Sequence, residues 1–265
     1  MINLGVNTVL FKAFSFAEAA RAIKLAGYDG LEISAIKGMC EHLDLEHYPS
    51  QKSEILEVMA ETGLKMLATE VASLDEERLE KAFQACAALG IPVINVGPGG
   101  KSGDEDTLIE SIGRLKKLAN LAAGYGVTLC CKAHVGAAIY NTPTTLRAMA
   151  ELDLPGFGID MDPSHIYRAG ENPEQALPAV LSMTRHIHVR DCKGRGPSPG
   201  EPALQACGRG DIDLFGYFQA MVDGKYNGPV NLEVIGPELS LAQATTIAAE
   251  SYGYMNACLK RLNAR

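Results

Sequence analysis

One unit recurs along the whole chain: a short apolar segment, a polar turn and a longer amphipathic segment. Short apolar runs bounded by turn residues predict buried strands, and apolar residues at helical spacing after each run predict a helix. Strands are expected at residues 2–8, 30–33, 65–71, 92–96, 127–133, 157–161, 186–189 and 229–234. Helices are expected at residues 16–25, 53–62, 74–89, 107–125, 142–152, 173–183, 213–222 and 239–262.

Eight strand–helix units of roughly thirty residues each predict an α/β fold of the (β/α)8 TIM barrel type. An open doubly wound sheet would normally place a glycine-rich phosphate-binding turn after its first strand, and NTVLFKAFS is no such turn. No linker or low-complexity stretch interrupts the pattern, so residues 1–265 are expected to form a single barrel domain.

Composition narrows the class of function. The 265 residues are 47% hydrophobic, which is enough for a large core, and the net charge of −8 argues against nucleic acid or anionic membrane as a partner. No run is apolar enough to span a bilayer, and the first residues lack a signal-peptide pattern. Seven scattered cysteines without a CxxC pair indicate reduced thiols and a cytoplasmic location.

Polar residues follow the predicted strands at the end where barrel enzymes place their active sites. The segment GIDMDPSHIYRAG delivers Asp162 and His165, and HIHVRD delivers His188. Imidazole and carboxylate groups that converge there suit Mn²⁺, Mg²⁺ or Zn²⁺. The alternative is a set of solvated strand ends without chemistry.

Four segments together resemble the xylose isomerase-like TIM barrel superfamily, in its sugar (phosphate) isomerase/epimerase branch. They are GVNTVLF with AIKLAGYDGLEIS, DPSHIYRAGENPEQAL, HIHVRD, and GRGDIDLFGYFQAMVDGKYNGPVNLEV. The match covers nearly the whole chain. It implies a divalent metal held by Asp162, His188 and Glu233, with Glu233 also the catalytic base.

The strand before His134 departs from the pattern of that superfamily. The segment reads LCCKAHVG, so Lys132 stands where the resemblance leads us to expect a glutamate ligand and a second acid–base carboxylate. Lys132 could stand in for the cation, act as a general base or Schiff-base amine, carry a carbamate, or mark a barrel that has lost catalysis. His134 is assigned to substrate binding, and if a metal is bound it is also the nearest replacement ligand.

The remaining site residues are assigned to substrate binding, and each has a structural alternative. His165 is expected to contact a substrate hydroxyl or carbonyl group, and Glu70 to orient a ligand histidine or lie at the rim. Lys193 and Arg209 lie in the Gly- and Pro-rich segment 192–211, a candidate lid, where they could bind an anionic group or simply be solvated. His186 is expected to face the surrounding helices.

The resulting hypothesis is an isomerase or epimerase that removes a proton next to the carbonyl group of a small carbohydrate-like substrate. The alternatives are a lyase or dehydratase that uses Lys132, and a non-catalytic binding barrel. An endonuclease for abasic DNA shares the superfamily, but an acidic chain with six histidines disfavours it. Related barrels are often dimers or tetramers, so a homo-oligomer is expected.

Overall fold

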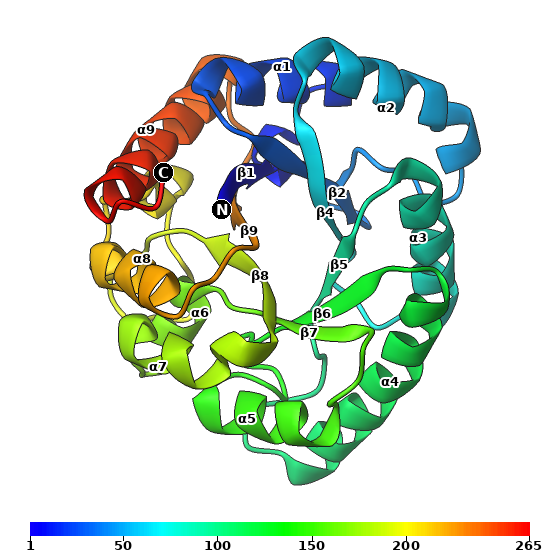
Figure 1. Ribbon diagram of the computed structural model, residues 1–265, viewed down its shortest axis with the longest axis vertical. Helices are drawn as coiled ribbons and strands as arrows, with labels where there is room; N and C mark the ends of the chain where they lie inside the picture. The colour runs from blue at the N-terminus through cyan, green and yellow to red at the C-terminus, as the bar shows by residue number, and fades with distance from the viewer.

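A computed structural model describes residues 1–265, and its centre is a closed barrel of parallel strands (Figure 1). Around the barrel the order is β1, β2, β4, β5, β6, β7, β8 and β9, and β9 returns to β1. Closure is visible in the register, because β1 places Gly5 beside Gly30 of β2 and Leu4 beside Val230 of β9. The predicted (β/α)8 barrel is confirmed.

The strands and helices alternate along the chain, and Figure 1 shows the helices surrounding the strands. The strands are β1 (Asn3–Asn7), β2 (Gly30–Ile36), β4 (Lys65–Glu70), β5 (Val93–Val96), β6 (Thr128–Lys132), β7 (Phe157–Asp160), β8 (Thr184–Val189) and β9 (Pro229–Leu232), with a short antiparallel β3 (Cys40–Glu41) beside β2. The helices are α1 (Phe16–Ala26), α2 (Tyr48–Thr62), α3 (Glu76–Leu89), α4 (Glu105–Gly124), α5 (Thr142–Glu151), α6 (Pro163–Arg168), α7 (Pro173–Val180), α8 (Leu214–Asp223) and α9 (Leu241–Arg261). Short 3₁₀ turns are η1 (Thr8–Phe11), η2 (Leu181–Met183) and η3 (Pro202–Gln205).

Local sequence signals account for most helix boundaries. Ser15 and Glu18 form a reciprocal capping box at the start of α1, and Gly27 ends the helix in the left-handed region at φ 102°. Helix α2 begins earlier than predicted, at Tyr48, with a proline in its first turn. The single turn-and-a-half of α6 was not predicted, because six residues carry too little periodicity.

A single cluster of 72 buried residues fills the space between barrel and helices, so strands β1 to β9 and their covering helices share one core. All seven cysteines are buried and free, as the sequence predicts for small core residues. No helix combines the length and the apolar character that crossing a membrane would require.

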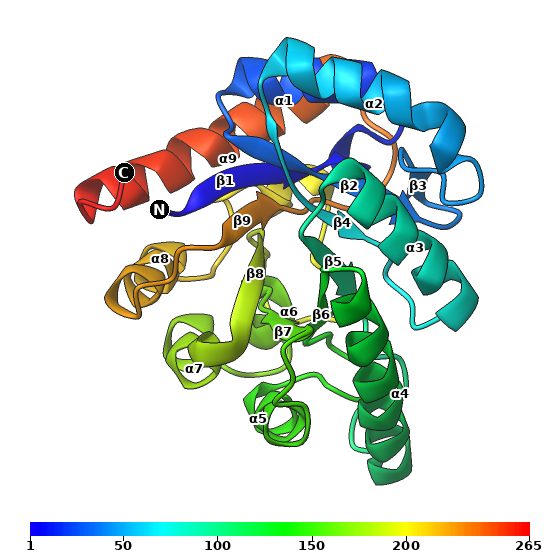
Figure 2. The same cartoon turned by 45° about the vertical axis from the view of Figure 1, so that its right-hand side comes forward.

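The barrel interior is largely polar above a small apolar base of Ala68, Val93 and Cys130. Gly5 shows how tightly this interior is filled, because a Cβ atom there would lie 1.9 Å from Oδ1 of Asn231. Figure 2 shows α9 alongside β1, with both termini on that side. There, Arg265 donates two hydrogen bonds to Asp29, at 2.7 and 2.9 Å.

Candidate active site at the carboxyl end of the barrel

A cavity of about 140 Å³ opens where the barrel strands end. Its polar lining consists of Glu70, Lys132, His134, His165, Arg190 and Glu233. A larger groove of about 420 Å³, between η3 and α9, lies outside the barrel mouth and contains no buried ionisable group. The barrel mouth is therefore the candidate active site.

Lys132 ends β6 and lies at the centre of this cavity. Its Nζ donates to Oε1 of Glu70 at 2.9 Å and to Oε1 of Glu233 at 3.0 Å. Burial alone would lower the pKa of Lys132, but Glu233 and Glu70 outweigh it and raise that pKa above its ordinary value. The side chain is therefore a fixed ammonium ion, which disfavours its use as a free amine for base or Schiff-base chemistry.

Glu233 follows β9 and faces two cations. Besides Lys132, NH1 of Arg190 lies 3.2 Å from its Oε2. Burial works to raise the pKa of Glu233, but Lys132 and Arg190 hold it well below the ordinary value. Glu233 is therefore a buried carboxylate at neutral pH.

Glu70 ends β4 and behaves differently, although it shares Lys132. Burial and the neighbouring charge of Glu233 raise its pKa to about 8, against the opposing effect of Lys132. Asn7 donates from Nδ2 to Oε2 of Glu70 at 2.6 Å. Glu70 can thus hold or release a proton near neutral pH, which is what acid–base catalysis requires. We call Glu70, Lys132, Arg190 and Glu233 the cavity cluster.

Asp162 and Arg190 form a pair at one wall of the cavity. Oδ1 of Asp162 accepts from the backbone N–H of Ser164 at 2.7 Å and so caps α6, while its Oδ2 lies 3.0 Å from NH2 of Arg190. Although burial would raise it, the charge of Arg190, with a smaller effect of Lys132, keeps the pKa of Asp162 below its usual range. Asp162 is therefore already committed to a protein cation.

His165 stands on α6 between two guanidinium groups. NH2 of Arg190 lies 2.8 Å from Nε2, and NH2 of Arg168 lies 3.0 Å from Nδ1. Burial, added to the positive charge of Arg190, lowers the pKa of His165 far below its ordinary value, so the ring is neutral. The ring of His134 lies against it, with centroids 3.9 Å apart and planes tilted by 37°, and is more exposed. Both nitrogens of His165 therefore face protein groups, whereas Nδ1 of His134 bonds the carbonyl oxygen of Val135.

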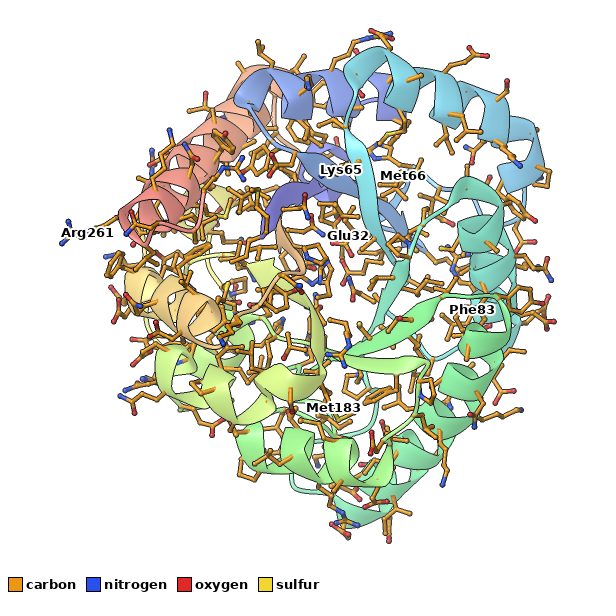
Figure 3. The ribbon with its side chains drawn as sticks, in the orientation of Figure 1. Glu32, Lys65, Met66, Phe83, Met183 and Arg261 are labelled. Carbon is orange, nitrogen blue, oxygen red and sulfur yellow. The ribbon has the colours of Figure 1, made fainter.

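A second group of charges lies beneath the cavity and is fully sealed. We call it the sealed cluster, and its members are Glu32, Asp160, His186 and His188, all 0% exposed. Nε2 of His188 contacts Glu32, and Nδ1 of His188 lies 2.7 Å from Oδ2 of Asp160. Although burial opposes it, these carboxylates raise the pKa of His188 well above normal, so the imidazolium form is favoured. Figure 3 shows Glu32 inside the ring of strands, whereas Arg261 projects outward from α9.

The expectation for His186 was wrong. Its Nδ1 lies 3.0 Å from Oδ1 of Asp160, and its ring centroid lies 4.6 Å from that of His188, so both histidines face the barrel interior. The physical reason is the two-residue period of a strand, which puts residues 186 and 188 on one face. The same period predicts Arg190 and Asp160 as interior residues. Sequence reasoning placed Arg190 at the end of this strand without giving it a role, and it missed Asp160.

The segment 192–211 does not bring its cations to the cavity. Nζ of Lys193 lies 3.4 Å from Oδ1 of Asp211, and Arg209 donates to Glu250 at 2.7 Å, in both cases at the exposed surface. Their expected role in substrate binding is therefore not supported. Asp191 holds this segment in place, because its carboxylate accepts hydrogen bonds from the backbone N–H groups of Cys192, Gly208 and Ile212.

The backbone beside Glu70 is strained. Ala72 adopts φ 64°, a left-handed conformation that residues with a Cβ rarely take, and it lines the cavity together with Gly97. The N–H of Gly97 donates to the carbonyl oxygen of Ala72 at 3.4 Å. Such strain persists where the surrounding structure holds a segment in place, and it is common at functional sites.

The residues do not fit the divalent metal that the resemblance implies. His188 faces a carboxylate at each ring nitrogen, Asp162 faces Arg190, and the Nζ of Lys132 lies on the carboxylate of Glu233. Nδ1 of His188, Oδ2 of Asp162 and Oε2 of Glu233 make no hydrogen bond, but each faces an oppositely charged protein group, at 2.7, 3.0 and 3.2 Å respectively. A metal ion would need the lone pairs of these atoms directed at one point, where the protein's own cations already lie. The atoms of Glu70, His188 and Glu233 do lie within 4.8 Å of one another, but the Lys132 ammonium is bonded to both carboxylates.

A closed (β/α)8 barrel with ionisable groups at the carboxyl ends of its strands defines the protein as a TIM-barrel protein of the enzyme type. The family described as xylose isomerase-like TIM barrel matches residues 20–258, and the chain therefore belongs to that family. Sugar epimerases and dehydratases are found among its relatives.

Three relatives illustrate the range. The inosose dehydratase of Clostridium botulinum (strain Alaska E43 / Type E3) is 24% identical over 261 residues, covering 84% of this chain and 83% of the relative. The 3-dehydroshikimate dehydratase of Bacillus anthracis is 20% identical over 188 residues, covering 67% of this chain and 66% of the relative. The solved structure of D-psicose 3-epimerase with D-tagatose, from Clostridium cellulolyticum H10, has a TM-score of 0.79 at 15% identity, covering 97% of this chain and 99% of that one. At this identity, the structural likeness shows the shared fold.

Proposed function

We propose that this protein is an enzyme that removes a proton next to the carbonyl group of a small polyhydroxylated substrate. The observation that carries the proposal is the cavity cluster, in which the ionised Glu233 lies beside the fixed cations Lys132 and Arg190. Removal of such a proton leaves an enediolate, and preorganised cations in a small, largely buried site stabilise the negative charge that develops on its oxygen.

Each side chain can be given a role in that step. Glu233 is the base. A bound substrate oxygen that accepts hydrogen bonds from Lys132 and Arg190 weakens the hold of these cations on Glu233. The pKa of Glu233 therefore rises when substrate is bound, which makes it a stronger base. Glu70, whose pKa is about 8, is the group suited to return a proton. His134 is placed to bind a substrate hydroxyl group, and His165 could do so only by exchanging one of its guanidinium partners.

The geometry favours reactions that use one side of the substrate. One oxygen atom of Glu70 and one of Glu233 lie within 4.8 Å of each other, and Lys132 bonds to both side chains. Two groups that attack opposite faces of one carbon, each from about 3–3.5 Å, need a separation of about 6–7 Å. Isomerisation through an enediolate needs only one side, whereas epimerisation by these two carboxylates would need both.

Dehydration is the other reaction that uses one side of the substrate, and two observations favour it. Loss of a hydroxyl group next to the enediolate requires an acid beside the base, and protonated Glu70 and Lys132 lie on the same side of the cavity as Glu233. The curated relatives described above are an inosose dehydratase and a 3-dehydroshikimate dehydratase. Between the two one-sided reactions, we rank dehydration first.

The common step is tested by hydrogen exchange. The protein is incubated in D₂O with ketohexoses, an inosose and 3-dehydroshikimate, and NMR follows both exchange next to the carbonyl and the products. Glu233→Gln is expected to lower the exchange rate about 10²–10⁴-fold, because the base is lost. It should fold, since Lys132 keeps Glu70 and Arg190 keeps Asp162 as partners.

The matched control is Glu201→Gln, at an exposed position outside the cavity, which should exchange at the wild-type rate. An unchanged rate in Glu233→Gln would remove Glu233 from the mechanism. Inertness of the wild-type protein toward the whole panel would favour a binding barrel without catalysis.

The cytoplasmic location and the homo-oligomer remain predictions. Cell fractionation would test the location, and size-exclusion chromatography would test the oligomeric state.

A further inference from the structure

The Lys132 ammonium occupies the point between two carboxylates where a divalent ion would have to lie. Its Nζ is 2.9 Å from Glu70 and 3.0 Å from Glu233. A metal ion bound by both carboxylates would need oxygen atoms at about 2.0–2.6 Å. The ion and the ammonium would therefore compete for the same space and repel each other.

The second oxygen of each carboxylate is also engaged. Oε2 of Glu70 accepts from Asn7 at 2.6 Å, and Oε2 of Glu233 lies 3.2 Å from NH1 of Arg190. Turning Oε2 of Glu70 toward a metal would break its hydrogen bond from Asn7, which is costly in a buried site. Oε2 of Glu233 makes no hydrogen bond, and the charge of Arg190 faces it instead. Protein cations therefore lie against Glu233 from both sides.

The ammonium group also offers what a metal would offer to a substrate oxygen. A lysine side chain carries three N–H donors, and Glu70 and Glu233 take two of them. Lys132 lines the cavity, so the third N–H is available to a bound molecule.

We infer that Lys132 replaces the divalent cation in this barrel, so that the protein binds its substrate without a metal and directs the third N–H of Lys132 at the carbonyl oxygen. The claim that the third N–H of Lys132 points at a carbonyl oxygen rests on the proposed function. The replacement itself concerns the folded chain and is tested without any substrate.

The test compares the wild-type protein with Lys132→Glu and Lys132→Met, each titrated with Mn²⁺ and with Zn²⁺ by calorimetry. Metal retained after desalting is measured by mass spectrometry. The wild-type protein should bind neither ion at this site. Lys132→Glu supplies a carboxylate and removes the blocking charge, so it should bind at least about 10–100-fold more tightly than the wild type. Its Tm should rise when Mn²⁺ is added, because the metal relieves repulsion among three carboxylates.

Lys132→Met separates the two effects, because it removes the charge without adding a ligand, and it should bind metal more weakly than Lys132→Glu. Lys116→Glu, on the exposed face of α4, has the same charge change and should leave metal binding as in the wild type. Near-stoichiometric metal in the wild-type protein would overturn the inference. If Lys132→Glu does not fold, the inference is tested by metal binding to Lys132→Met and by the Tm of the wild-type protein. A wild-type Tm that Mn²⁺ raises would also overturn the inference.

These outcomes are independent of the exchange experiment. A metal-free wild-type protein that is inert toward every ketone would support the replacement while contradicting the proposed function. An active protein that retains stoichiometric Mn²⁺ would support the proposed function while contradicting the replacement of the metal by Lys132.

Discussion

The barrel contains two neighbouring groups of buried charge that differ in their access to solvent. The sealed cluster of Glu32, Asp160, His186 and His188 is 0% exposed throughout, whereas Lys132, Glu70 and Glu233 of the cavity cluster are 3–4% exposed and line an open cavity. Both groups pair each cation with carboxylates. Only the cavity cluster can exchange those partners for a ligand.

The comparison indicates that the sealed cluster serves stability and the cavity cluster serves activity. In the sealed cluster, an imidazolium is held between two carboxylates, and nothing else can reach it, so its contribution is to the geometry and stability of the barrel. In the cavity cluster, burial and the neighbouring charge of Glu233 raise the pKa of Glu70 to about 8, although Lys132 acts against them. Variants in the two clusters should therefore separate stability from activity.

The largest effect on stability is expected from Asp160→Asn. Asp160 accepts from His186 and from the backbone N–H of His188, and its second oxygen faces the His188 ring. Loss of the Asp160 charge breaks one of the two buried ion pairs of His188 and leaves Glu32 as its single carboxylate partner, so the free energy of unfolding should fall by about 3–5 kcal/mol. Urea denaturation measures it, with the exposed Asp153→Asn as control. A change below about 0.5 kcal/mol would mean that the sealed cluster does not stabilise the barrel.

Asn7→Ala should affect both clusters, because Asn7 connects them. Its Nδ2 lies 3.2 Å from Glu32 and 2.6 Å from Glu70, and its Oδ1 caps η1. Removal of these bonds should cost about 1–3 kcal/mol in unfolding free energy and should lower activity as well. Asn227→Ala, at an exposed loop position, is the control. A variant that loses stability but keeps full activity would show that the cavity cluster does not depend on this link.

Glu70→Gln should change how stability depends on pH. The pKa of Glu70 is about 8 in the folded protein and 4.5 for an ordinary glutamate. Between these values the folded protein holds a proton that the unfolded chain has released, so stability falls as pH rises through the window, by at most about 1.4 kcal/mol per pH unit. Glu70→Gln should flatten that slope in urea denaturation at several pH values, whereas exposed Glu54→Gln should not. An unchanged slope would show that Glu70 titrates normally.

The sequence by itself predicted the barrel, because strand and helix periods are local properties that neighbouring residues encode. It also predicted that Glu70, Lys132, His165 and Glu233 would meet, since parallel strands deliver their last residues to one end of a barrel. The boundaries differed from the predicted ones mostly by a few residues, as for α2, which begins at Tyr48.

Only the tertiary structure decided which charge each site residue meets. Lys132 pairs with Glu233, 101 residues away in sequence, and with Glu70, 62 residues away. Arg190 forms an ion pair with Asp162, whereas Lys193 and Arg209 pair with carboxylates at the surface. The physical reason is that the pairing of a charge depends on distances of a few ångströms between strands remote in sequence. No local pattern encodes those distances, and they determine whether a carboxylate at the barrel mouth faces a metal or an ammonium group.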